Sequence, residues 1–454
     1  MPMTDFTIVR RSLNARLFST VTTALTVGVA VALLFVLLTL RDSAKSAFSR
    51  GSGNMHLLVS AEASELESVL HSVFYTGAPQ AFFPYRFVDE LDEILGEADA
   101  PAQFIIPTQV GDSFRGMPVV ATTEDFFTEF QPFEGQPWVA ASGRWFEKPF
   151  EVVLGAEVAR TSGLRVGQMI YLTHGMSRRA GAGNDIATDD DHHHDHDHDH
   201  DHDDAHIHRE YRFEIVGILA ATGTSHDRAL FTHLIGSWIM HAHDRRLAEL
   251  GHGIELTTEA DLTEADRIIT AAMVRIAGRA GRATAVNVPA AAVTIRRSGL
   301  GLRVAAPGDE VRKLFRIVSN LDQIFIALAG AILISSGIGI LLALYNSMEQ
   351  RRRQIAVLRV LGSSRSRIFG LIMTESAVIG MLGAAAGLAI GLVGSQLATG
   401  ILRDRLGLDI RPEISPEWLL VLAAATTLLA TLAGLIPAIM AYRTSVARNL
   451  RPIA

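Results

Sequence analysis

Four long apolar runs stand out in the pattern of hydrophobic and polar positions, one near the beginning of the chain and three in its last third. Residues 17–40, 323–348 and 418–442 contain no charged side chain, and residues 369–402 contain one, Glu375. A helix needs about 20 consecutive, mostly apolar residues to cross the hydrocarbon core of a bilayer. The pattern therefore predicts an α-helical membrane protein with four transmembrane helices over these residues.

The first apolar run has two interpretations. A cleaved signal peptide has an apolar core of about 7–15 residues, followed by a cleavage site of small residues. The run here covers residues 17–40, and the residues after it, 43–47, make a poor cleavage site. We therefore expect an uncleaved first transmembrane helix after a short N-terminal segment, residues 1–16.

Residues 41–320, between the first and second runs, are mostly polar. They contain short sequence patterns typical of strands and others typical of helices. Short runs of apolar and β-branched residues favour strands, and longer amphipathic stretches favour helices, the last of which Asp261 or Thr263 can cap. These elements do not alternate regularly, so we predict a large α+β domain. We expect strands at 104–106, 119–121, 151–154, 169–172 and 213–219, and helices at 64–73, 156–161, 230–243 and 260–278.

A basic segment joins the second and third runs. If it is helical, one face carries three apolar side chains, Ile355, Leu358 and Leu361. Gly362 suits the left-handed conformation that ends a helix, and either of the two serines that follow can cap the next helix. We predict an amphipathic coupling helix within residues 349–367, between two membrane helices.

This segment carries a family resemblance. It reads EQRRRQIAVLRVLGSS from Glu349 to Ser364, and it is similar to the pattern E-R-x-R-E-I-x-x-L-R-A-L-G-A-S of MacB/FtsX-type ABC transporter permeases. Gln350 and Gln354 replace the two usual acids, while Glu349 keeps one acid nearby. The resemblance extends to the residues GLIPA at 434–438 and to the N-terminal segment. It implies a permease related to macrolide-efflux and lipoprotein-release permeases.

The resemblance also implies partners. A separate ATPase subunit would hydrolyse ATP and dock on the basic segment, and the permease would act as a homodimer or as a heterodimer with a paralogous permease. The outer domain would resemble the MacB-like periplasmic domain, with one subdomain at about 54–150 and 254–300 and another at about 151–250. A basic helix lying on anionic lipid is the alternative for the segment. The ATPase-coupling residues would be Glu349, Arg352, Arg353, Ile355, Leu358, Leu361, Gly362 and Ser363.

The sequence gives no sign of catalysis by this chain. It contains no G-x-x-x-x-G-K-[ST] run, so it lacks a nucleotide-binding loop of its own. It contains no cysteine, which excludes disulfides and thiol chemistry. Ser225, His226 and Asp227 are adjacent, whereas the members of a catalytic triad usually come from distant segments. We therefore predict a non-catalytic permease subunit whose ATP is bound by its partner.

One tract has an unusual composition. Residues 189–208 hold nine His and nine Asp among twenty residues, inside a loop that we predict to be disordered over 175–209. Imidazole and carboxylate together favour Zn, Ni, Cu or Co. A solvated acidic linker is the alternative, but it does not explain so many histidines, so we expect loosely bound zinc. The metal ligands would be His192, His193, His194, His196, His198, His200, His202, His206 and His208.

Two further patterns each leave two interpretations open. His233, His241 and His243 lack the single-face spacing of H-E-x-x-H, so we expect surface histidines, with a metal role shared with the tract as the alternative. Small residues at helical spacing in the third run allow close approach of helices, either inside the four-helix unit or across a dimer seam. These small residues are Gly380, Gly383, Gly387, Gly391 and Gly394.

The arginines predict the orientation in the membrane. The N-terminal segment, the basic segment and the tail at 443–454 are rich in Arg, whereas the loop at 403–417 holds three Arg against four acids. By the positive-inside rule, both termini are cytoplasmic, and the large domain and the 403–417 loop lie outside the bacterial inner membrane. The net charge of −7 is exceeded by the nine Asp of the tract, so nothing here indicates nucleic acid.

We therefore predict the permease subunit of an ABC transporter that couples ATP hydrolysis to a periplasmic conformational change. The His/Asp tract links it to transport of zinc or another transition metal, with a periplasmic adaptor or metal-binding protein as a further partner. One alternative is an FtsX-like signalling scaffold that regulates a periplasmic partner. Another is an efflux or lipoprotein-release permease unrelated to metal.

Overall fold

The computed structural model describes residues 5–50, 52–175, 207–251, 253–278, 287–360, 362–406 and 416–443. The chain divides into two compact units. The membrane unit combines residues 1–45 with 316–454, and the α+β unit comprises residues 46–315.

The membrane unit is helical. Four helical stretches among the described residues are long and apolar enough to cross a membrane, namely Leu17–Ser43, Ile326–Asn346, Arg365–Ile401 and Pro416–Arg443. The predicted fold class, four such helices with a large α+β domain between the first and the second, is confirmed. The helices of this unit are α1 (Asp5–Asn14), α2 (Leu17–Arg50), α9 (Pro307–Val360), α10 (Arg365–Leu406), α11 (Pro416–Ala433) and α12 (Leu435–Arg443), and the division between the units falls within α2 and α9.

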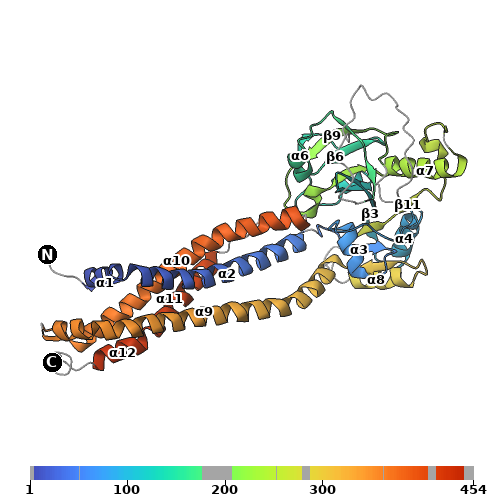
Figure 1. The fold of residues 1–454 in the computed structure, drawn as a ribbon. Helices are drawn as coiled ribbons and strands as arrows, with labels where there is room; N and C mark the ends of the chain where they lie inside the picture. Colours follow the sequence, from blue (N-terminus) through green and yellow to red (C-terminus); the bar gives the residue numbers. More distant parts are fainter. Residues whose placement is uncertain are drawn as a thin grey trace. The chain divides into compact units, whose positions relative to one another are not determined.

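Glycines let α10 pack closely against α2 and α11, which run beside it in Figure 1. A Cβ atom added at Gly387 would lie 2.5 Å from the carbonyl oxygen of Gly28 on α2, and one added at Gly380 would lie 2.5 Å from Cβ of Ala430 on α11. A Cβ atom added at Gly383, Gly391 or Gly394 would likewise lie 2.7–3.2 Å from a side chain of α2. The small residues of the third run were predicted to allow close packing either inside the four-helix unit or across a dimer seam. The structure shows packing inside the unit.

The α+β unit is built on one large mixed sheet. Its strands follow the order β13-β1-β12-β3-β4-β10-β6-β9-β5, with β7 paired to β9 and β8 paired to β3, and a separate two-stranded sheet joins β11 and β2. The strands are β1 (Leu57–Ser60), β2 (Phe83–Pro84), β3 (Ala102–Phe114), β4 (Met117–Thr122), β5 (Ala140–Gly143), β6 (Glu151–Leu154), β7 (Met169–Ile170), β8 (Thr173–His174), β9 (Phe213–Leu219), β10 (Leu230–His233), β11 (Ile268–Ile269), β12 (Ala271–Ile276) and β13 (Arg303–Ala305).

The sheet is continuous across the two subdomains expected from the sequence. Strand β4 belongs to the first expected subdomain and β10 to the second, and the two pair in parallel with Val120 opposite Phe231. The helices of this unit are α3 (Glu65–Ser72), α4 (Phe87–Glu97), α5 (Asp125–Thr128), α6 (Ala156–Ser162), α7 (Leu234–Leu250) and α8 (Asn287–Arg297), with short 3-10 helices at Ser225–Arg228 and Glu259–Asp261.

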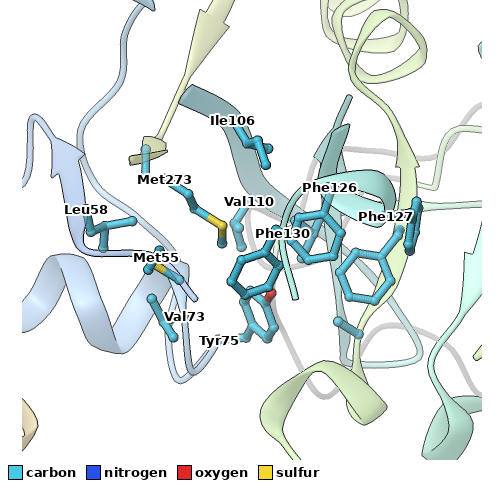
Figure 2. Close-up of a cluster of buried hydrophobic side chains, with 14 of the residues drawn as sticks. Met55, Leu58, Val73, Tyr75, Ile106, Val110, Phe126, Phe127, Phe130 and Met273 are labelled. Carbon is cyan, nitrogen blue, oxygen red and sulfur yellow. The ribbon is translucent and has the colours of Figure 1, made fainter. Parts of the chain in front are cut away.

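Both faces of the sheet are buried. Along β1, Leu58 joins one apolar cluster while Leu57 and Val59 join another, because successive strand residues point to opposite faces. The cluster with Leu57 and Val59 is covered by leucines of α4 and by alanines and an isoleucine of α8. The cluster with Leu58 is closed by aromatic side chains. Figure 2 shows Phe126 and Phe130 converging there with Val110, Met273 and Tyr75.

Most of the predicted strands and helices of the α+β unit are confirmed. The five predicted strands fall within or overlap β3, β4, β6, β7 and β9, and the helices predicted at 64–73 and 156–161 are α3 and α6. The helix predicted at 260–278 is wrong, because Ala271–Ile276 forms strand β12 between β1 and β3. The predicted helix at 230–243 begins later, at Leu234, since Leu230–His233 forms strand β10.

Candidate functional site

The turn between α9 and α10 is the part of the membrane unit where the sequence concentrates its positive charge. Residues 350–374 contain six Arg and no acid. Gly362 has φ +95°, the left-handed conformation predicted for the residue that ends α9. The hydroxyl of Ser364 accepts a hydrogen bond of 3.2 Å from the backbone N–H of Arg367, so it caps α10 as predicted. The helix end and the cap together fix a tight turn.

The base of this turn is anchored to two other membrane helices. Ile355 is 6% exposed and packs in a cluster with Ile368 and Ile372 of α10 and with Ala438 and Ala441 of α12. Apolar contacts of this kind hold the last turns of α9 against α10 and α12. The end of α9 is therefore packed against both helices.

Two apolar side chains near the end of α9 are exposed. Val357 is 45% exposed and Val360 is 63% exposed, and their spacing of three residues puts them on one face of the helix. Arg359, between them in the chain, is half-buried, and exposed Arg365 at the start of α10 lies over the ring of Tyr442 at 5.9 Å. The exposed part of the turn thus combines cations with a small apolar surface.

The predicted coupling residues differ in where they lie. Gly362 is exposed, Ser363 is half-buried, and Ile355 is part of the packing within the unit. Residues 349–360 continue α9 rather than standing apart from it. The side chains of Glu349, Arg352, Arg353 and Leu358, and the whole of Leu361, lie outside the described residues.

Glu375 is a buried carboxylate in α10. It is 5% exposed, and its Oε1 accepts a hydrogen bond of 3.2 Å from the hydroxyl of Ser12 on α1. A carboxylate inside a membrane helix is costly unless polar groups meet it. Farther along the unit, the indole N–H of Trp418 on α11 donates to Asp42 on α2 at 3.0 Å. These two polar contacts tie α1 to α10 and α2 to α11.

Of the nine tract histidines predicted as metal ligands, the structure describes one, His208, and the other eight lie outside the described residues. His208 is 1% exposed, and its backbone N–H donates to the carbonyl of Leu172 at 2.9 Å. Thr173, which precedes residues 176–206, forms a β-bridge with Ile207, which follows them. Strands β8 and β9 flank the tract, as predicted.

The three histidines predicted to lie on the surface have other environments. His243 is 3% exposed and meets the hydroxyl of Thr257 at 3.0 Å, and His233 accepts from the backbone N–H of Ile235 at the start of α7. His241 lies 3.1 Å from Asp112, with His174 nearby. Asp112 and His174 were not predicted, because no local spacing in the sequence connects them with His241.

The adjacent Ser225, His226 and Asp227 form no catalytic triad. The carboxylate of Asp227 accepts hydrogen bonds from the backbone N–H groups of Thr222 and Gly223, so it organises the loop before it. The hydroxyl of Ser225 donates to the carbonyl of Val73 at 2.6 Å, and His226 points into the aromatic cluster.

Two known domain families match this chain. Residues 20–272 match the MacB-like periplasmic core domain, and residues 326–446 match the FtsX-like permease C-terminal domain. The chain belongs to the MacB/FtsX-type ABC transporter permeases. The first match covers most of the α+β unit and the second covers the α9–α10 turn with the last three membrane helices.

Two curated relatives of this MacB/FtsX-type permease are themselves named as uncharacterised ABC transporter permeases. One, from Mycobacterium tuberculosis, is 36% identical over 140 residues, which is 29% of this chain and 16% of the relative. The other, YknZ of Bacillus subtilis, is 29% identical over 86 residues, 19% of this chain and 22% of the relative. The matched parts thus span less than a quarter of each relative.

Proposed function

We propose that this MacB/FtsX-type permease is the membrane subunit of an ABC complex, and that a separate ATPase subunit binds its α9–α10 turn. The observation that carries the proposal is the turn itself, where exposed Val357 and Val360 stand among arginines while Ile355 fixes the base. Six Arg without an acid over residues 350–374 favour a partner surface that supplies carboxylates around an apolar pocket.

The proposed mechanism is mechanical. ATP-driven movement of the ATPase subunits displaces the turn, and the contacts of Ile355 with α10 and α12 pass this displacement to the other helices. Helices α2 and α9 are each continuous across the division between the two units, so a change of tilt in either reaches the α+β unit. Cargo need not cross the membrane through the helices for this coupling to do work.

The proposal includes an orientation and an assembly. The turn and both termini lie in the cytoplasm of a bacterial inner membrane, and the α+β unit lies in the periplasm, because the arginines gather on one side of the four helices. Two permease chains pair with two ATPase subunits. The density of His and Asp at 189–208 favours zinc or another transition metal as the cargo class.

The test uses charge on the exposed apolar face. We expect the double variant Val357→Asp, Val360→Asp to insert normally, because both side chains are exposed. It should lose at least about tenfold in co-purification with the ABC ATPase subunits of its own genome, since burying an unpaired carboxylate at an interface costs several kcal/mol. Stimulation of ATP hydrolysis should fall with it.

The matched control is Val357→Thr, Val360→Thr, which changes shape little and adds no charge. It should retain most of the ATPase binding. If the Asp variant binds and stimulates the ATPase subunits as well as the unsubstituted chain does, this face of the turn is not the docking site.

A further inference from the structure

We propose that Asp112, His174 and His241, with His208 as a fourth ligand, form a binding site in the α+β unit for a single zinc-class divalent transition metal ion. The site is distinct from the eight tract histidines outside the described residues, and it goes beyond the proposed coupling to an ATPase. Within the described part of the chain, no other group of three His, Asp or Glu side chains brings its ligand atoms this close together.

The ligand atoms already stand at the spacing of a metal site. Oδ1 of Asp112 lies 3.1 Å from Nε2 of His241 and 3.4 Å from Nδ1 of His174. Ligands at about 2.0–2.1 Å from a tetrahedral zinc ion are separated from one another by roughly 3.3 Å. One ligand atom from each of the three residues lies within 4.8 Å of the ligand atoms of the other two. An ion can therefore enter with small side-chain movements.

The backbone holds two of these ligands in fixed register. Asp112 of β3 stands directly opposite His174 of β8 in the antiparallel pair. The register of β3 with β4 is interrupted between Val110 and Ser113, and Asp112 lies within this irregularity. Such bulges re-aim side chains at functional sites. Asp112 is 3% exposed, so its carboxylate is held in the interior rather than on the surface.

Helix α7 supplies the third ligand together with a residue that orients it. Nε2 of His241 faces Asp112, and its other ring nitrogen, Nδ1, lies 3.2 Å from the side-chain amide of Gln109 on β3. An amide can donate to Nδ1 or, turned over, accept from it, so Gln109 holds the ring in either tautomer. Partners of this kind fix metal-bound histidines in known sites.

The fourth ligand, His208, lies at the far end of the tract, outside the group whose ligand atoms are within 4.8 Å of one another, and would join them by a movement of its side chain. The ring of His208 is centred 6.2 Å from that of His174 and 6.4 Å from that of His241. Asp244 lies 3.6 Å from Nδ1 of His208, so we assign Nε2 to the metal. His174 and His208 stand on either side of residues 176–206, and the Thr173–Ile207 bridge holds these two ends together. A bound ion would add a second link between them.

The donor set selects the class of ion. Three imidazoles and one carboxylate suit zinc and its neighbours, whereas Ca²⁺ and Mg²⁺ prefer oxygen ligands throughout. Asp112 supplies the carboxylate of this set, and His174 and His241 supply imidazoles.

Two hydrogen bonds from histidines to one buried Asp would give the same distances without any metal. The experiment must therefore detect the ion itself, free of the loose sites of the tract. We would use the full chain in detergent with residues 189–206 replaced by a short Gly/Ser linker, which leaves His174 and His208 in place. The bridge at Thr173 and Ile207 supports folding of this tract-free chain.

We expect the tract-free chain to retain one zinc equivalent after dialysis and to unfold at a higher temperature with zinc, because the ion binds the folded state. Asp112→Asn and His241→Gln should each weaken zinc binding by more than about 10–100-fold, the loss that follows removal of even an outer-shell partner. The matched control is His71→Gln. It breaks a His–carboxylate pair of similar length, 3.2 Å to Glu62, outside the cluster.

X-ray absorption of the zinc-loaded, tract-free chain keeps the test decisive even if a ligand variant fails to fold. We expect a first shell of imidazole nitrogens with one carboxylate oxygen. Absence of retained zinc, an all-oxygen shell, or unchanged affinity in folded Asp112→Asn and His241→Gln would overturn the proposal. Neither ATP nor an ATPase subunit is needed, so failure of this site and failure of the coupling proposal are separate results.

Discussion

His226 shows how one residue can make stability depend on pH. Its side chain is fully buried, its Nδ1 lies 2.8 Å from the hydroxyl of Tyr75, and its ring packs edge-on against Phe126, Phe130 and Trp138. Burial disfavours the charged imidazole and lowers the pKa of His226 to about 3. In the folded α+β unit this histidine is therefore neutral over the whole physiological range.

This lowered pKa predicts a loss of stability in acid. Between pH 6.5 and about 3, the unfolded chain binds a proton at His226 and the folded chain does not. The free energy of unfolding therefore falls as pH falls, by up to about 1.4 kcal/mol per pH unit from this residue. We expect His226→Leu to make the free energy of unfolding depend less on pH between pH 6.5 and 5. Chemical unfolding of the full chain, followed by tryptophan fluorescence, measures this dependence.

The control for this prediction is Tyr75→Phe, which removes the hydroxyl beside Nδ1 but leaves the buried imidazole. Its free energy of unfolding should depend on pH as steeply as that of the unsubstituted chain, because burial causes the shift in the pKa of His226. Equal slopes for His226→Leu and the unsubstituted chain would show that other groups, such as the half-buried His56 and His233, set the pH response instead.

The sequence predicts residues whose role is local and misses those whose role depends on distant contacts. The left-handed Gly362 and the serine cap of α10 follow from a few neighbouring residues, and both are confirmed. Asp112 and His241 are 129 residues apart, and they meet only because β3, β8 and α7 are arranged around one sheet. No spacing pattern in the sequence predicts this contact.

At the scale of elements, the same distinction between local and distant contacts explains why the helix predicted at 260–278 is wrong. Residues Ala271–Ile276 are apolar at almost every position, a pattern that a buried helix and a buried strand share. Strand β12 is held on both sides, by β1 and by β3. Pairing with two neighbours decides the conformation, and neither neighbour can be identified from the segment itself.

The glycines of α10 give a prediction about helix packing. A Cβ atom at Gly387 would lie 2.5 Å from the carbonyl oxygen of Gly28 and 2.6 Å from Cβ of Val31, so α10 would have to move away from α2. A Cβ atom at Gly400 would meet nothing within 4 Å. We expect Gly387→Ala to destabilise the membrane unit by about 1–3 kcal/mol, the usual cost of overpacking.

Gly400→Ala is the matched control, because the same methyl group is added to the same helix in open space. It should be neutral or stabilising by about 0.5–1 kcal/mol, since Ala favours a helix over Gly. Thermal unfolding of the two variants in detergent provides the comparison. Equal unfolding temperatures would show that the α2–α10 contact is looser than the glycines indicate.

At the scale of the whole molecule, the apolar runs predict the helices of the membrane unit well, because a bilayer demands long uncharged stretches. The α+β unit is less predictable. Its sheet joins the two expected subdomains through the parallel pair of β4 and β10, whose members lie far apart in the chain. Parallel pairing of distant strands follows from the complete fold and leaves no signature in either strand.

The orientation of the chain is the last prediction, and the absence of cysteine makes it directly testable, because any introduced cysteine is the sole thiol. Leu250 is 67% exposed at the end of α7, and Ser363 lies in the α9–α10 turn. If the arginine-rich turn is cytoplasmic, a membrane-impermeant maleimide should label Leu250→Cys in cells whose outer membrane has been permeabilised. It should label Ser363→Cys only after the inner membrane is broken, and both variants should then react. Labelling of Ser363→Cys with the inner membrane intact, and protection of Leu250→Cys, would reverse the orientation and remove the turn from the reach of a cytoplasmic ATPase.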